Sequence, residues 1–404
     1  MFFRHFYLFV EFVFVLSGFF LIDVLQVFFA FCSLFTGYFT VNKRAVTLAE
    51  RKYMIMKEKI TSPNKYIYSV DLIRVLCMGW VCLFHAMIHC GFSVGIESID
   101  KLVSIGAAGC QGFFMISGFM LRKKYRDVIW TKDLLKKYLF SRLIGIYPVY
   151  GALTFLAILT KYRFPDGIRP LLNVLPMQLS LLQVWFFPSS YPIMFNDNFW
   201  FLSVLFTLYL LFPALNCITN MLSSRTKKIL CILLPIVSFY CYYICISLGQ
   251  AFQAYYMSPL LRIFEFWLGS VIFDIADESS MKMKGRTVFA ATVLCMSMLL
   301  LIYPRFSTNY NLYNIILLPY FAFLLFSAYK NPEWGHFPPV QYLSECGLSI
   351  YSCQSITILL KPFFTYYRGI AYVVVTLIAA VIIHEIVEKP LKWFFQRVVL
   401  PPSK

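Results

Sequence analysis

The sequence is poor in charged residues. Only 14% of its 404 residues are Asp, Glu, Lys or Arg, against roughly a quarter in soluble domains. A soluble fold of this size would have too little polar side chain to cover its surface, so a soluble enzyme is excluded. Acidic residues are the scarcer sign, at 19 against 36 basic ones. In an apolar chain this excess indicates basic cytoplasmic loops rather than nucleic-acid binding.

Paired cysteines and internal repeats are also lacking. The twelve cysteines are scattered, no C-x-x-C pair occurs, and nearly all lie in apolar runs. We expect them to be small buried hydrophobic residues rather than disulfides or metal ligands. The composition likewise excludes a long disordered chain, a disulfide scaffold and a coiled coil.

Long apolar runs make up most of the chain, which is 60% hydrophobic and has 43 Phe. A helical span needs about 20 mostly apolar residues. We therefore predict an all-α, polytopic membrane bundle of about ten core transmembrane helices. The ten candidate stretches are 70–90, 104–121, 141–160, 199–219, 229–248, 258–276, 287–303, 311–328, 346–364 and 370–388.

The chain is expected to divide into three parts. Residues 1–65 form an N-terminal hydrophobic segment and a basic cytoplasmic linker, 66–395 form the membrane domain, and 396–404 form a cytoplasmic tail. The first 41 residues are too long for the apolar core of a signal peptide. They are either one tilted helix or a hairpin.

Charge placement decides a doubtful eleventh span at 171–188, which is short and contains Pro176. If this stretch does not cross, 26 basic residues face one side of the membrane and seven face the other. The positive-inside rule therefore favours ten spans in the plasma membrane, with both ends of the core in the cytoplasm. Residues 161–198 then form a long outer segment, whose aromatic and amide side chains suit a sugar.

Ionisable groups inside spans are expensive, so each is a candidate functional residue. Arg74 and His85 lie eleven residues apart in the first core span. Three helical turns plus about 20° place them on one face, with a rise of about 16 Å between them. This spacing suits an anion clamp near the inner interface and a titratable imidazole deeper in the membrane. Alternatively, Arg74 extends to lipid headgroups and His85 bonds to a neighbouring helix.

Further polar groups border the same inner side. Arg122 and Arg142 join Arg74 there and suit a polyanionic ligand such as a nucleotide-bearing cofactor. Small residues Ser117 and Gly118 allow close helix approach. His89 lies one turn beyond His85, but no third ligand is visible, so we expect no metal site.

The ordered set of motifs resembles the acyltransferase-3 family of integral membrane acyltransferases. The resemblance covers about residues 66–395. In chain order the matching elements are Asp71-x-x-Arg74-x10-His85, Gly112-Phe-Phe-x-x-Ser117-Gly118-Phe119, Arg142 ahead of Ile146-Tyr147-Pro148, Phe199-Trp200-Phe-Leu-Ser203 running to Pro213, Arg262-x-Phe-Glu265-Phe266-x-x-Gly269, Leu348-Ser-Ile-Tyr351 and Ile386-Val-Glu388-Lys389-Pro390.

The resemblance implies an O-acyltransferase with ten spans. Its donor would be cytoplasmic acyl-CoA, commonly acetyl-CoA, and its acceptor a hydroxyl of a cell-surface or lipid-linked glycan. We expect a stand-alone enzyme, without the extracytoplasmic domain that some relatives append. The implied residue roles are catalytic for His85 and Arg74, donor-binding for Arg74, Arg142, Arg122 and Tyr147, and weaker substrate-binding for Ser117, Trp200, Arg262 and Glu265.

The chain also departs from the family pattern. Ser141 and Gly145 stand where relatives carry further arginines, and Gln354 stands where a His is common. The physical demand of acyl transfer is a base for the acceptor hydroxyl, which His85 supplies either as a general base or as an acyl-His nucleophile. Two rival functions are a transporter or flippase of lipid-linked sugars and a glycan polymerase, but no two-fold repeat typical of transporters is evident.

Overall fold

The computed structural model describes residues 66–161, 175–185, 196, 198–249, 255–306, 309–358 and 368–399. This part of the chain is helical and contains no strand, which confirms the predicted all-α class. The chain separates into two units: one holds 1–66 with 168–180, and the other holds 67–167 with 181–404. Everything below except one short helical turn belongs to the second unit.

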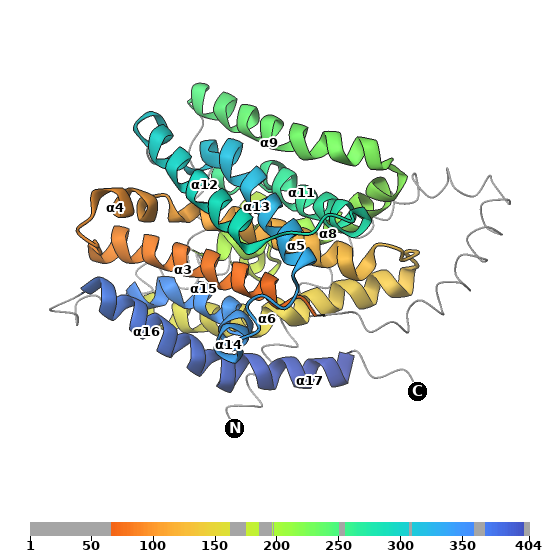
Figure 1. Ribbon diagram of the computed structural model, residues 1–404. Helices are drawn as coiled ribbons and strands as arrows, with labels where there is room; N and C mark the ends of the chain where they lie inside the picture. The colour runs from red at the N-terminus through yellow and green to blue at the C-terminus, as the bar shows by residue number, and fades with distance from the viewer. Residues whose placement is uncertain are drawn as a thin grey trace. The chain divides into compact units, whose positions relative to one another are not determined.

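The helices follow one another through the second unit (Figure 1). Their bounds are α3 Tyr68–Cys90, α4 Glu97–Ser104, η1 Gly106–Ala108, α5 Gly109–Tyr125, α6 Lys132–Lys161, η2 Gln183–Trp185, α8 Phe199–Met221, α9 Ser224–Ser247, α11 Pro259–Glu278, α12 Gly285–Phe306, η4 Tyr310–Tyr313, α13 Asn314–Lys330, α14 Pro338–Glu345, α15 Gly347–Thr357, α16 Arg368–Ile383, the π-helical segment η6 His384–Glu388 and α17 Lys389–Val399.

Each of the ten predicted spans coincides with a helix, but not every helix meets a strict criterion for crossing. Seven described helices are long and apolar enough to span a membrane. An eighth is reached if α4 and η1–α5, which meet at a 43° bend, count as one span. The two that fall outside are α11, which carries several charged residues, and α15, of which only eleven residues are helical. A polytopic helical membrane protein is therefore shown, while the number ten stays a prediction.

The doubtful stretch 171–188 is described only from 175 to 185. Residues 175–179 are helical, and separately η2 is a single 3-10 turn after Leu181, whose φ is 58°. Neither piece approaches the length of a span. The remaining residues of the stretch, and the N-terminal segment 1–65, lie outside the described residues, so both predictions stay untested.

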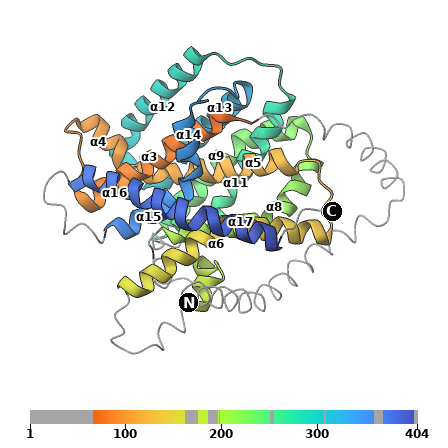
Figure 2. The same ribbon diagram turned by 90° about the horizontal axis from the view of Figure 1, so that it is seen from below.

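Helix α5 is the central element of the unit. It packs against α3, α8, α11 and α13, and α3 in turn lies beside α16 (Figures 1 and 2). The main apolar core joins side chains from α3, α5, α11 and α13, among them Cys77, Phe119, Leu268 and Leu325. Seven of the eleven described cysteines are buried, as predicted.

Two glycines set how closely α5 and α11 approach. A Cβ atom on Gly118 would overlap the carbonyl oxygen of Phe266, and one on Gly269 would overlap the carbonyl oxygen of Met115. The two contacts are reciprocal, because each glycine admits the backbone of the other helix. Ser270 Oγ also donates a hydrogen bond of 3.0 Å to the Gly118 carbonyl. Gly118, one of the small residues predicted to permit close approach, therefore does so here.

We expect Gly118→Ala to destabilise the protein by about 1–3 kcal/mol, because the added methyl forces α5 and α11 apart. Thermal unfolding of the detergent-solubilised protein measures this. The matched control is Gly151→Ala in α6, where a Cβ would meet nothing within 4 Å. Equal melting temperatures for the two variants would contradict the packing argument.

Candidate functional site

Arg74 is anchored in the N-terminal half of α3 by contacts with Asp71 and Ser344. Its Nη1 donates to Asp71 Oδ1 at 3.0 Å and to Ser344 Oγ at 2.7 Å. Ser344, in α14, donates in turn to Asp71 Oδ1 at 2.7 Å. The Arg74 side chain remains 30% exposed. Its position is therefore fixed by polar contacts on one edge while the rest of the guanidinium stays accessible.

His85 forms a side-chain hydrogen bond to a residue of α15. Its Nδ1 lies 2.5 Å from Oε1 of Gln354, a residue that is fully buried. When the amide oxygen is the acceptor, Nδ1 carries the imidazole proton and the lone pair is on Nε2. The sequence pointed to Gln354 only as a departure from the family pattern. Its contact with His85 depends on packing between segments 269 residues apart.

Arg74 and His85 both face the same neighbouring segment. The partner of Arg74 is Ser344, at the end of α14, and the partner of His85 is Gln354, in α15. Helix α15 packs along α3. Ser344 and Gln354, ten residues apart in the α14–α15 segment, therefore contact Arg74 and His85, which are eleven residues apart in α3. This arrangement agrees with the shared helical face that the spacing predicts.

A cavity of about 290 Å³ opens beside Arg74. Its wall is built from α3, α5, α6, α8, the α14–α15 segment and the η6–α17 segment. The lining includes the polar residues Arg74, Ser117, Ser141, Arg142, Ser344, Glu345, Glu388 and Lys392 and the aromatic residues Phe113, Phe201, Tyr209 and Tyr351. Two predicted donor-binding residues, Arg74 and Arg142, are thus brought to one cavity. His85 is not among its lining residues.

Arg142 presents a cation that has no carboxylate partner among the described residues. Its guanidinium carbon lies 5.7 Å from the ring centres of Tyr138 and Tyr209, and its Nε and Nη2 each donate to Ser141 Oγ at 3.3 Å. No described Asp or Glu lies within ion-pair distance of it. Because a guanidinium lining a cavity without a counter-ion attracts an anion, Arg142 is the strongest anion-binding candidate in this site.

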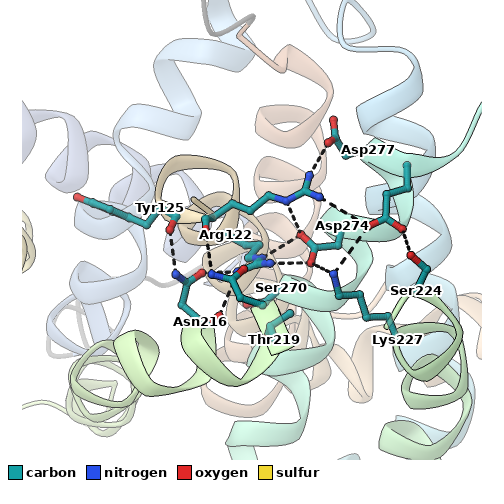
Figure 3. Close-up of polar contacts among 12 residues, drawn as sticks. Arg122, Tyr125, Asn216, Thr219, Ser224, Lys227, Ser270, Asp274 and Asp277 are labelled. Carbon is teal, nitrogen blue, oxygen red and sulfur yellow. Dashed lines mark hydrogen bonds and ion pairs between the residues drawn. The ribbon is translucent and has the colours of Figure 1, made fainter. Parts of the chain in front are cut away.

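Arg122, the third predicted donor-binding arginine, does not line this cavity and is engaged in contacts with other helices (Figure 3). The side chain is 1% exposed and makes a two-point contact with Asp274, from Nε to Oδ1 at 2.9 Å and from Nη2 to Oδ2 at 2.7 Å. Its Nη1 donates to Asn216 Oδ1 at 2.5 Å. Lys227 also pairs with Asp274, at 2.6 Å. All three guanidinium nitrogens are used, so Arg122 joins helices rather than facing a ligand.

The five remaining predicted residues divide in the same way. Arg262 and Glu265 are fully buried and pair at 2.8 Å, and the guanidinium is surrounded by four aromatic rings that include Trp200. None of these three lines the cavity described above. Tyr147 does not line it either, and its ring contacts Tyr150. Ser117 does line the cavity.

Two amide side chains just before α8 donate hydrogen bonds to the backbone of α15. Asn196 Nδ2 donates to the Ser352 carbonyl and Asn198 Nδ2 to the Tyr351 carbonyl, each at 2.8 Å. Both bonds fix the backbone of α15 one turn before Gln354. The expectation that this segment contacts a sugar is therefore replaced, for these two side chains, by a role in holding α15.

A hydrogen bond joins α14 to the π-helical segment η6. Tyr342 donates to Glu385 Oε1 at 2.8 Å, and this hydrogen bond raises the pKa of the phenol to about 12. The phenol therefore stays protonated at neutral pH and keeps the bond.

In the described residues, no group of three or more His, Cys, Asp or Glu is arranged to hold a metal ion.

A family model described as an acyltransferase domain matches residues 67–385. The chain belongs to the acyltransferase-3 family. It is therefore a membrane acyltransferase that transfers acyl groups other than aminoacyl groups, which decides against the transporter and polymerase alternatives. No curated protein and no solved structure matches the chain.

In this acyltransferase we expect Asp274→Asn to cost about 3–5 kcal/mol of stability, because it leaves Arg122 and Lys227 without their shared buried counter-ion. Thermal unfolding measures this. The matched control is Asp277→Asn, one turn further along α11, where the 39% exposed carboxylate pairs with Arg126 and is worth about 0–1 kcal/mol. Similar melting temperatures for the two variants would refute a structural role for the Arg122 cluster.

Proposed function

We propose that this acyltransferase moves an acetyl group from cytoplasmic acetyl-CoA to a hydroxyl of a cell-surface or lipid-linked glycan. The observation that carries the donor assignment is Arg142, a cation with no carboxylate partner in the described part of the chain, in a cavity that Arg74 also lines. CoA is a polyanion, and paired guanidinium groups are the side chains best suited to phosphate. The glycan acceptor follows from the resemblance stated above.

The cavity also suits the rest of such a donor. Beyond the arginines its wall becomes aromatic and aliphatic, with Phe113, Phe201 and Tyr351. Tyr351 lies one helical turn, about 5 Å along α15, before the residue that holds His85. A donor whose phosphates bind Arg74 and Arg142 would extend its thioester along this wall towards the imidazole.

His85 is proposed as the general base. With Nδ1–H directed to Gln354, the lone pair on Nε2 accepts the proton of the acceptor hydroxyl as its oxygen attacks the thioester carbonyl. The tetrahedral oxyanion collapses, the C–S bond breaks, and the thiolate of CoA leaves with the proton returned from Nε2. Gln354 is neutral, so it orients the imidazole without adding a charge. Arg74 takes no part in this proton transfer and binds the phosphate groups of the donor.

We propose that the membrane domain spans residues 66–395, within which the family match falls, flanked by the segment 1–65 and the tail 396–404. The excess of basic residues on one side supports a plasma-membrane protein whose core begins and ends in the cytoplasm. This orientation places the Arg74 end of the cavity on the side where CoA is found.

The catalytic proposal predicts that His85→Ala lowers kcat for acetyl transfer by about 10²–10⁴-fold, because the general base is lost. Binding of CoA should change little, since His85 does not line the cavity. Turnover of acetyl-CoA by purified protein and calorimetric binding of CoA measure the two effects. The control is His336→Ala, an exposed histidine stacked on Tyr68. Undiminished transfer by the His85 variant would refute the assignment.

The donor proposal predicts that Arg142→Ala raises the Kd for CoA by about tenfold or more, because a charge-assisted hydrogen bond is worth about 1.5–3 kcal/mol. The control is Arg286→Ala, an exposed arginine outside the cavity. Binding of CoA is measured by calorimetry in detergent. An unchanged Kd for the Arg142 variant would place the donor elsewhere.

A further inference from the structure

Lys392 is a third cation of the cavity that the residue roles above leave unassigned. It lies in α17 and lines the cavity together with Arg74 and Arg142. The three cations lie on three different helices, Arg74 on α3, Arg142 on α6 and Lys392 on α17. Helix α17 packs against α6, and Ser344 of α14 contacts Arg74 of α3. Its side chain is 30% exposed, so the ammonium can contact a ligand.

Glu388 fixes where that ammonium lies. Lys392 Nζ donates to Glu388 Oε1 at 2.5 Å. The other carboxylate oxygen, Oε2, accepts from Ser349 Oγ at 2.6 Å and lies 2.8 Å from His384 Nδ1. Glu388 is fully buried, and both its oxygens are occupied by donors. Its charge is therefore locally compensated and opposes a bound anion only weakly.

The local backbone supports this arrangement. Residues His384–Glu388 form a π-helical segment between α16 and α17. The wider turn of a π-segment rotates the helix that follows, and such segments recur at functional sites. Here it occurs where Glu388 contacts α15 and where the next turn carries Lys392 to the cavity. One proton of the ammonium is used by Glu388, which leaves two for a ligand.

We infer that Lys392, positioned by Glu388, binds a phosphate group of the acyl donor beside Arg74 and Arg142. Three separate cations around one cavity suit a donor that carries several phosphate groups, such as the diphosphate and 3′-phosphate of CoA. The remaining carboxylate of the cavity wall, Glu345, is exposed. This inference rests on the proposed donor site and adds a residue to it.

The chain offers a close control for Lys392. Lys389 also pairs with a glutamate four residues earlier, Glu385, at 2.6 Å, but it is exposed and does not line the cavity. Replacing either lysine by alanine removes one helical (i, i+4) ion pair and one positive charge. A difference between the two variants in CoA binding therefore reports the cavity and not the net charge.

We expect Lys392→Ala to raise the Kd for CoA by roughly tenfold, and Lys392→Arg to stay within about threefold of the wild type. Lys389→Ala should leave the Kd unchanged. The probe is CoA itself, titrated into the detergent-solubilised full chain, with the KM for acetyl-CoA as a second readout. The dependence of Kd on salt should weaken in Lys392→Ala and not in Lys389→Ala.

Because Lys392→Ala leaves Glu388 buried with one donor fewer, the double variant Glu388→Gln/Lys392→Ala provides a form without that unpaired charge. It should also show the tenfold loss. The inference is overturned, and the donor site stands, if Arg142→Ala weakens CoA binding but Lys392→Ala and Glu388→Gln/Lys392→Ala do not. The same conclusion follows if Lys389→Ala weakens CoA binding as much as Lys392→Ala does. If Arg142→Ala has no effect either, the proposed donor site itself fails.

Discussion

A charge inside a membrane protein is stable only with a partner, and this constraint decides what each ionisable side chain can do. Arg122 is neutralised by Asp274, and Arg262 by Glu265, in fully buried pairs. Every guanidinium nitrogen of Arg122 already has a protein partner, so this side chain has no capacity left for a ligand. Arg142 faces the cavity with two tyrosine rings and a serine hydroxyl as its described neighbours, so its charge is available for one. Arg74 and Lys392 each keep a carboxylate partner, but both are 30% exposed and line the same cavity.

The site depends on contacts that bring distant segments onto α3. Ser344 and Gln354 reach Arg74 and His85 across about 270 residues. Helix α5 packs against both α3 and α11, and it approaches α11 closely at Gly118 and Gly269. Ser117, the neighbour of Gly118, lines the cavity, so this packing also helps to shape the cavity wall. The proposed donor site at Arg74 and Arg142 and an imidazole hydrogen-bonded to Gln354 fit the acyl transfer of this family.

Several features could be predicted because they depend on local pattern or on composition. The helical class and the positions of the spans follow from apolar runs, since each span must satisfy its own backbone hydrogen bonds. The shared face of Arg74 and His85 follows from helical periodicity. Arg122 and Arg142 carry the same charge, stand twenty residues apart, and were given the same role. Only the position of Asp274, 152 residues further on, separates them. Lys392 and Lys389 have the same relation: both follow a glutamate by four residues, and only one of them reaches the cavity.

The sequence by itself determined that this is a polytopic helical membrane protein, and its ordered motifs indicated the acyltransferase family to which it belongs. These conclusions need only neighbours along the chain, through apolar length, periodicity and motif order. Tertiary structure alone decided which arginines are neutralised, that Gln354 holds His85, and that Arg74, Arg142 and Lys392 meet at one cavity. The physical reason is that the availability of a charge depends on its nearest counter-ion and on its exposure, and for Arg122 that counter-ion comes from another helix.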